Sequence, residues 1–489
     1  MFQGKKPVVC LLLAATALVT PQIAMAAAAA PSAREAALTD RLSKLEAELA
    51  QLRADLGAAK TQQADTAKTA QAADAHATTA AQVAQTAAKE AKDTSTRVAA
   101  VEKKAAPDGF RSGATTIKIG GFLKLQAASS HTDNGTVATN TLGRDFYLPQ
   151  SSIPVGGGRS QTTTDFSAKQ TRLWLNLDTQ VAGHTVRGYL ETDFQTAASP
   201  AQSVTGGGSQ RTTNGYTLAL RRAFVTLDKW TFGQDWTTFQ YTGALPESTD
   251  FLGATEGTVF VRQPLVRYST PLSKAVTLHV SAENPESATA NAGTPTLIEN
   301  GTDRLPDFAA RLVVTGKKSE LSVAALGRQV RTEVTGLGVT TTGFGGSVGG
   351  KLFLNNAKSS DLRFLATYGQ NISRYVGVNF APDAVYVAST NSLANVNVFA
   401  ALAAARVAIT PSVRVNLIGS YQSVDYDSAL APATIAAFNK SSWSGAANLF
   451  YSPVRAIDLG IEYRHGTREL VSGAKGSLDR IEFAAKYNF

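Results

Sequence analysis

The final thirteen residues, Ser477 to Phe489, alternate between apolar and polar side chains. Such alternation puts one kind of side chain on each face of a β-strand. In an outer-membrane barrel the apolar face meets lipid, the polar face meets a water-filled lumen, and the last strand pairs with the first so that no edge stays open. A soluble sheet can end in the same way, so this strand alone leaves both classes open. The apolar set is Ile481, Phe483, Ala485, Tyr487 and Phe489, and the polar set is Arg480, Glu482, Lys486 and Asn488.

Residues 1–26 have the pattern of a secretory signal peptide, which limits what the rest of the chain can be. Lys5 and Lys6 precede an apolar stretch, and a small-x-small site predicts cleavage after Ala26. The only cysteine, Cys10, is then lost with the signal, which excludes disulfides and thiolate metal sites from the mature protein. Beyond this segment there is no apolar run of about 20 residues, so a helical membrane bundle is excluded.

Leucines recur between residues 35 and 57 with alternating spacings of four and three, the pattern of a coiled-coil seam. A seam of leucine alone does not specify dimer or trimer, and a single amphipathic helix packed on its own protein is an open alternative. Residues 58–112 are rich in alanine with few large apolar side chains, so we expect a helical or flexible spacer there. The seam positions are Leu38, Leu42, Leu45, Leu49, Leu52 and Leu56.

From residue 113 to residue 489 the period changes to two, which predicts a transmembrane β-barrel of about 16 antiparallel strands. The connections alternate between short and long, as they do when short turns face the periplasm and long loops face outward. An even number of strands then puts both ends of the barrel on the periplasmic side. We therefore expect an all-β transmembrane barrel of the Gram-negative outer membrane, preceded by a short α-helical coiled coil in the periplasm.

Basic side chains recur on the strand parity that opposes the apolar residues, and the chain carries a net charge of +9. A lumen of one charge sign concentrates solutes of the opposite sign, so we expect small anionic solutes as partners. Nucleic acid is disfavoured because the basic residues are spread over strands and the protein is exported. The alternative is that these charges only keep the wall hydrated. The other basic residues of this parity include Arg311, Arg363, Arg414, Arg464 and Arg480.

Arg221 and Arg222 are adjacent, so strict alternation allows only one of them in the lumen. The apolar residues Leu218 and Leu220 lie on the parity of Arg222 and favour Arg221 as the inward side chain.

Three runs around the third long connection resemble the matching region of DcaP-like outer-membrane porins. They are Thr231 to Phe239, Leu245 to Phe251 and Arg262 to Tyr268, while Ile117 to Lys124 and Thr185 to Phe194 resemble the first and third strands of that family. The resemblance implies a homotrimer of sixteen-stranded barrels whose third long loop, at about 237–262, folds inward to narrow the pore. It also implies passive uptake of small organic anions, dicarboxylates among them.

The resemblance further implies which side chains line the pore. Arginines of the wall would form a basic surface for carboxylates, and two acids of the third loop would face them across a constriction. Phe489 would join the lipid-facing aromatic girdle and the C-terminal signal that the barrel-assembly machinery reads. The wall candidates are Arg172, Arg187, Arg221, Arg262 and Arg267, with Arg311 added by strand parity, and the loop acids are Glu247 and Asp250.

No motif for catalysis or for binding a metal or cofactor is evident in the sequence. The five histidines lack metal-ligand spacing, the glycine-rich stretches lack a Lys-Ser/Thr, and no nucleophile elbow occurs. We therefore predict a passive porin without enzyme activity or cofactor. Two alternatives stay open: a barrel that anchors a periplasmic coiled-coil tether, and an outer-membrane barrel hydrolase.

Overall fold

The chain forms two units, and the second begins at Ala106. The computed structural model describes residues 109–139, 141–195, 214–334 and 336–489, together with separate stretches between residues 40 and 89. The described residues of the first unit are helical. The seam leucines among them, Leu42, Leu49, Leu52 and Leu56, are each more than half exposed. The predicted signal peptide and the seam positions Leu38 and Leu45 lie outside the described residues.

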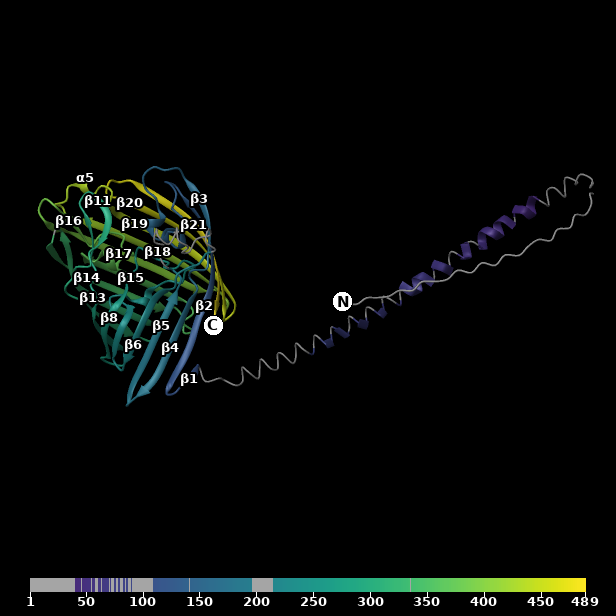
Figure 1. Cartoon of the computed structure of the whole chain (residues 1–489), viewed down its shortest axis with the longest axis horizontal. Coiled ribbons are helices and arrows are strands. Elements are labelled where there is room, and N and C mark those ends of the chain that lie inside the picture. The colour runs from purple at the N-terminus through teal and green to yellow at the C-terminus, as the bar shows by residue number, and fades with distance from the viewer. Residues whose placement is uncertain are drawn as a thin grey trace, which may run out of the picture. The chain divides into compact units, whose positions relative to one another are not determined.

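The second unit is a closed barrel of 16 antiparallel strands (Figure 1), which confirms the predicted fold class. The wall closes where β2 (Thr115–Thr132) pairs with β21 (Lys475–Asn488), from Phe122 opposite Asn488 to Thr132 opposite Leu478. The strands between them are β4 (Arg172–Val181), β5 (His184–Asp193), β6 (Ala219–Leu227), β7 (Trp230–Trp236), β8 (Arg262–Pro271), β9 (Val276–Glu283), β12 (Asp307–Thr315), β13 (Ser319–Val334), β14 (Leu337–Phe353), β15 (Asp361–Gln370), β17 (Ser392–Ala408), β18 (Val413–Tyr426), β19 (Asn439–Val454) and β20 (Ile457–Leu470).

Shorter elements lie in the connections. β1 (Phe110–Ser112) pairs with the start of β2, and β3 (Gln161–Ser167) pairs with its far end, so part of the connection between β2 and β4 is strand. Among the connections, β10 pairs with β16 in parallel, and β16 pairs in turn with the wall strand β17. The remaining elements are β10 (Ala288–Asn291), β11 (Thr294–Glu299), β16 (Ala384–Val387), α2 (Leu142–Asp145), α3 (Pro149–Ser152), α5 (Pro432–Ile435), η2 (Thr242–Ala244) and η3 (Ser373–Tyr375).

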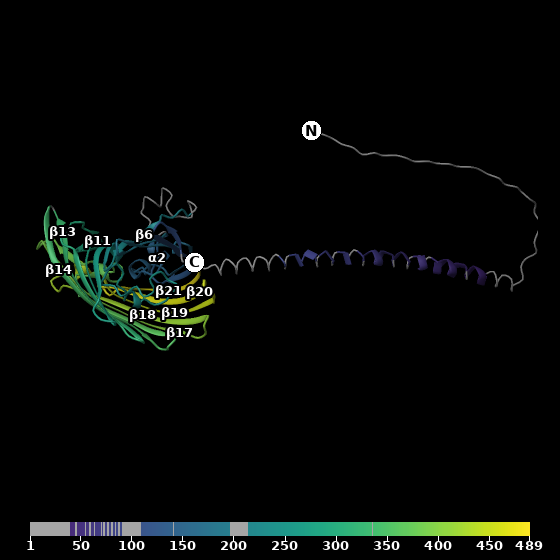
Figure 2. The ribbon, with the colours of Figure 1, turned by 90° about the horizontal axis from the view of Figure 1, so that it is seen from below.

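The two faces of the wall differ as the period-two pattern predicts. On β21, Ile481, Phe483 and Tyr487 are exposed on the outer face, whereas Arg480 and Glu482 are buried inside. The outer face is therefore an apolar surface suited to lipid. Figure 2 shows β17 to β21 side by side on one flank of this wall. None of the helices among the described residues is long and apolar enough to cross a membrane.

The chain ends on the closing seam of the barrel. The backbone N–H of Phe489 donates to the Gly121 carbonyl at 3.1 Å, and the Gly121 N–H donates to the Phe489 carbonyl at 3.1 Å. These two bonds satisfy the last peptide groups of the wall, which in lipid would otherwise have no partner.

Several of the described connections fold inward and pack together. We call residues 133–160 L1 and residues 237–261 L3; a further one is the segment 371–391. Their apolar side chains form a core inside the barrel, in which Phe239 and Val259 of L3 pack with Ile372 and Tyr375. Gly257 lets L3 approach β17 closely, because a Cβ there would clash with the carbonyl of Ala401.

Candidate pore lining and constriction

L3 leaves the wall after Trp236 and crosses the lumen to the opposite side. The Arg414 guanidinium on β18 donates to Glu247 of L3 at 2.6 Å, and the Ser248 hydroxyl donates to Glu462 on β20 at 2.7 Å. L3 is thereby held against the far wall, and the space that remains lies beside β2 to β8.

L1 and L3 are joined by buried hydrogen bonds. The Tyr147 hydroxyl of L1 donates to Glu256 of L3 at 2.6 Å, and Glu256 also accepts from Ser442 and Ser444 of β19 at 3.2 and 2.8 Å. Burial, reinforced by the Glu256 charge, raises the pKa of Tyr147 well above its ordinary value. The hydroxyl therefore stays protonated and remains a donor. The Tyr147 backbone N–H donates to Asp250 at 2.8 Å.

The free space beside β2 to β8 narrows where Phe251 of L3 faces arginines of the wall. The Phe251 ring centroid lies 5.1 Å from the Arg221 guanidinium carbon and 5.8 Å from that of Arg172. Arg262, at the start of β8, stacks over Trp236 at 5.2 Å and over Phe260 at 5.8 Å. Cation–π contacts of this kind hold guanidinium groups in place without neutralising them.

Three buried carboxylates share the arginines of this region. Arg221 donates to Glu191 at 2.6 Å and to Asp193 at 2.7 Å, and Arg172 lies 3.2 Å from Asp193. Arg222 donates to Asp235 at 2.6 Å, and Arg267 pairs with the same carboxylate. We call these five arginines and three acids the arginine cluster: Arg172, Arg221, Arg222, Arg262 and Arg267 with Glu191, Asp193 and Asp235.

The arginine cluster has a surplus of two positive charges, since five arginines face three carboxylates. The guanidinium of Arg262 makes no hydrogen bond or ion pair within the part of the chain that is described. Its partners are the rings of Trp236 and Phe260. It is the guanidinium of the cluster with the most bonding capacity left for a solute.

Both adjacent arginines of β6 reach carboxylates of the lumen, although strict alternation allows only one. The register between β5 and β6 shifts at Glu191 and Thr192, so that Glu191 lies opposite Arg222 and Thr192 opposite Leu220. Arg221 is the extra residue of this β-bulge. A bulge re-aims side chains, which explains why the expectation from parity was incomplete.

The other predicted residues are spread more widely. Arg187 is exposed near the short turn that joins β4 to β5, where it lies 3.3 Å from Asp178. Arg311 donates to the Gln240 carbonyl of L3 and supports the loop. Glu247 faces Arg414 on the far wall, and Asp250 accepts backbone N–H groups, so neither acid faces the arginine cluster.

A second basic set lies on the far wall from β14 to β21. Glu247 lies 2.6 Å from Arg414 and 3.7 Å from Arg406, and Asp458 lies 3.1 Å from Lys486. The second basic set consists of Lys351, Arg363, Arg406, Arg414 and Lys486, and its ion-pair partners are Asp361, Glu247 and Asp458.

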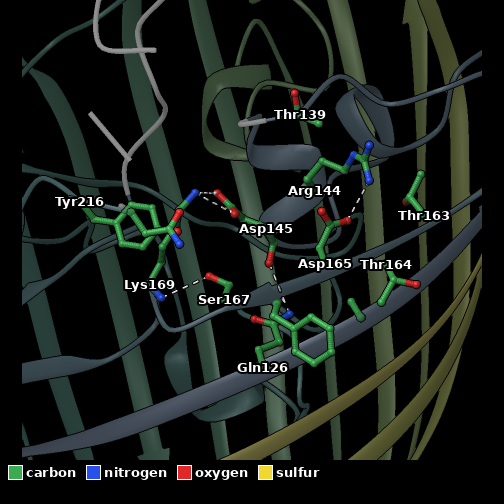
Figure 3. A pocket seen from close by; sticks show the side chains of 13 residues that line it. Gln126, Thr139, Arg144, Asp145, Thr163, Thr164, Asp165, Ser167, Lys169 and Tyr216 are labelled. Atoms are coloured by element: carbon green, nitrogen blue, oxygen red, sulfur yellow. Dashed lines mark hydrogen bonds and ion pairs between the residues drawn. The ribbon is translucent and has the colours of Figure 1, made fainter. Parts of the chain in front are cut away.

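Three cavities lie along the free side of the lumen. The first, which we call the outer cavity, lies beside β3 and has a volume of about 430 Å³; its lining includes Gln126, Asp145 and Lys169 (Figure 3). The inner cavity, of about 170 Å³, is lined by Lys124, Gln170, Arg172 and Phe251 among others. A third cavity, of about 270 Å³, joins Phe251 and Phe260 to Arg262.

Sequence reasoning did not single out the aromatic and amide groups of this region. Phe251 and Trp236 stand within the runs that resemble the family, but nothing in one sequence marks a ring as facing an arginine. Gln170 follows Lys169, and two adjacent polar residues at a break in alternation were the available signal. Among the described residues no group of three or more His, Cys, Asp or Glu side chains is arranged to hold a metal ion.

Comparisons with known proteins gave one family model and several similar solved structures. The model of the DcaP outer membrane protein family matches residues 89–489. The crystal structure of the outer membrane channel DcaP of Acinetobacter baumannii is 24% identical with a TM-score of 0.63, covering 78% of this chain and 99% of that one. The loop L8 deletion mutant of OmpT, an outer membrane protein of Vibrio cholerae, is 11% identical with a TM-score of 0.47, covering 77% and 100%. OmpF of Salmonella typhi in complex with daunomycin is 12% identical with a TM-score of 0.44, covering 78% and 99%. No curated protein matches the chain.

Proposed function

The chain belongs to the DcaP outer membrane protein family, and from the lining of its lumen we propose that it favours small organic anions, dicarboxylates among them. The family and the closed sixteen-stranded barrel make it an outer-membrane porin. Solutes cross such a channel down their own gradient, and selectivity arises from the size and the charge of the constriction. We infer that no covalent step takes place.

One observation carries the proposed anion preference: the surplus of arginine over carboxylate where Phe251 narrows the lumen. Arg172 and Arg221 share Glu191 and Asp193, so their charges are largely matched. Arg262 lies beside them, and within the described residues no acidic side chain forms an ion pair with its guanidinium. A planar guanidinium with free N–H groups binds a carboxylate through two parallel hydrogen bonds. Lys486 of the second basic set lines the inner cavity together with Arg172 and supplies a further cation for a solute with a second carboxylate.

Substrate class is tested by liposome swelling. Proteoliposomes are placed in isotonic salts of mono- and dicarboxylates matched in size, and in a matched organic cation. We expect faster swelling with the anions, and fastest with the dicarboxylates. Equal rates for anions and the organic cation would refute the proposal. Measurable single-channel conductance separates the porin from a plugged barrel that serves only as an anchor or as a hydrolase.

For the first unit we propose the organisation indicated by the sequence: signal peptide 1–26, coiled coil 35–57 and spacer 58–112, with the last two in the periplasm. The exposed leucines of the helix support an association with other copies of the chain, because an apolar seam in water needs a partner. We propose a homotrimer, with the C-terminal strand recognised by the barrel-assembly machinery.

A further inference from the structure

The wall is interrupted between β3 and β4, beside the arginine cluster. Gln126 of β2 lies opposite Ser167, and Phe122 lies opposite Arg172, so four residues (168–171) face three residues of β2. The extra residue makes a bulge, in which the Thr171 N–H donates to the Ala168 carbonyl at 3.0 Å. As a result the adjacent side chains Lys169 and Gln170 both point inward and are buried, at 7% and 4% exposure.

Gln170 forms the centre of a hydrogen-bonded bridge that links L3 to L1. The Lys124 ammonium donates to Gln170 Oε1 at 2.5 Å and to the Thr249 carbonyl of L3 at 2.6 Å. The Gln170 amide N–H donates to Gln126 Oε1, and the Gln126 amide N–H donates to the Asp145 carbonyl of L1 at 3.3 Å. We call Lys124, Gln126 and Gln170 the bridge; all three are at least nine-tenths buried.

The bridge lies between two cavities. Gln126 and Asp145 line the outer cavity, whereas Lys124, Gln170 and Thr249 line the inner one. A solute that moves from the outer to the inner cavity along β2 must therefore open the contacts of Gln170 and replace them with its own.

The outer cavity is electrically balanced. Arg144 lies 2.9 Å from Asp165, and Lys169 lies 2.8 Å from Asp145, and Figure 3 shows each pair pointing toward one another. No charge is left over to attract an ion, and an ion would have to break one of these pairs. Hydroxyl and amide groups provide hydrogen bonds, and the ring of Tyr216 lies 4.9 Å from the Lys169 ammonium. The cavity lining includes Gln126, Thr139, Thr163, Thr164 and Ser167.

We propose that this path along β2, which meets the arginine cluster at Arg172 and Phe251 of the inner cavity, is a second route into the channel, taking uncharged polyhydroxylated solutes, with the bridge as its selectivity filter. Hydroxyl groups both donate and accept, so a polyol can exchange hydrogen bonds with the two amides and the ammonium of the bridge. The amides of Gln126 and Gln170 are uncharged, and the Asp250 carboxylate lines the inner cavity together with Lys124. The proposal rests on the porin function but not on the anion preference.

The test compares swelling of proteoliposomes in ribitol, an uncharged five-carbon polyol, with the reversal potential in a salt gradient. Gln170→Ala removes the centre of the bridge without changing a charge, so we expect a several-fold rise in ribitol-driven swelling with an unchanged reversal potential. Gln150→Ala is the matched control, because Gln150 lies on α3 and lines neither cavity. Arg262→Gln should have the opposite profile, with weaker anion preference and unchanged ribitol swelling.

Two outcomes would overturn this inference. One is a rate of ribitol-driven proteoliposome swelling that is unchanged in Gln170→Ala, when heat-modified migration in gel electrophoresis shows that the barrel of this variant is folded. The other is a shift of the reversal potential in the same variant, which would assign the bridge to the anion path. Failure of the proposed anion preference gives a different result. The wild-type channel would then show no preference for chloride in its reversal potential, independently of the rate of ribitol-driven swelling.

Discussion

The arginine cluster predicts that anion preference depends on net charge rather than on any one arginine. Replacing Arg221 and Arg267 together with glutamine leaves three arginines facing three carboxylates, which removes the surplus of two charges. The Arg221 guanidinium lies 5.1 Å from the Phe251 ring that narrows the lumen. At a separation of about 6 Å, one unit charge contributes ~0.7 kcal/mol to the energy of an anion at the dielectric constant of water and ~2.8 kcal/mol at a dielectric constant of 20. Loss of both charges therefore costs the anion at least ~1.4 kcal/mol, or about tenfold in permeability.

The assay is the reversal potential of single channels in planar bilayers under a potassium chloride gradient. Low ionic strength is used because salt screens such interactions over about 10 Å at 0.1 M. We expect the double variant to lose most of its preference for chloride. Arg187→Gln is the control, because this arginine is exposed near a short turn away from the constriction, and its reversal potential should stay close to that of the wild type.

Removal of Arg221 also leaves buried carboxylates with fewer partners, which costs about 3–5 kcal/mol when a buried pair is broken. A charge-matched variant separates this effect from selectivity. Adding Asp193→Asn and Asp235→Asn to the double variant restores the surplus of two, so chloride preference should return. If the double variant keeps its preference, or if the charge-matched variant fails to regain it in a folded barrel, the surplus does not set selectivity.

Three further predictions concern the loops and the first unit. Tyr147→Phe removes a hydrogen bond to a charged group between L1 and L3, which should cost about 1.5–3 kcal/mol and lower the midpoint of urea unfolding; an unchanged midpoint would contradict the L1–L3 link. Hydrogen bonds from His184 and Thr185 lower the pKa of Asp228, in the β6–β7 turn, below its ordinary value of 3.8. The ionised carboxylate therefore stabilises the turn fully above pH 3.8, and this stabilisation is lost as the pH falls through the lowered pKa. Hydrogen exchange of the Thr185 amide should accelerate only in that lower range. Protection of Thr185 that ends above pH 3.8 would contradict this sign. Deleting residues 35–106 should weaken the stability of the trimer, and a variant with unaltered trimer stability would refute the role proposed for the coiled coil.

The wall of the barrel was predictable because its determinants are local. Strands such as β2 and β21 follow directly from alternation, since each side chain meets either lipid or the lumen. β3 is hard to predict because Phe166 is the one large apolar side chain of Gln161–Ser167, and pairing with the end of β2 makes it a strand.

The arrangement of the lumen was only partly predictable, because it depends on contacts between distant segments. The inward position of Arg221 followed from parity, but a one-residue bulge also brings Arg222 inside, and no local pattern announces it. Asp250 was expected to face the arginines, yet it accepts N–H groups from Tyr147 and Leu252. An acidic side chain in a loop satisfies nearby backbone donors first, and which donors are near is decided by L1, more than a hundred residues away in the chain.

The central claim is that the lumen of this porin selects for anions. The most direct test is the reversal potential of the wild-type channel in a potassium chloride gradient at low ionic strength. We predict a potential displaced toward the equilibrium potential of chloride, with the displacement shrinking as salt is raised. A potential at zero, or one displaced toward that of potassium, would contradict the assignment of the arginine cluster.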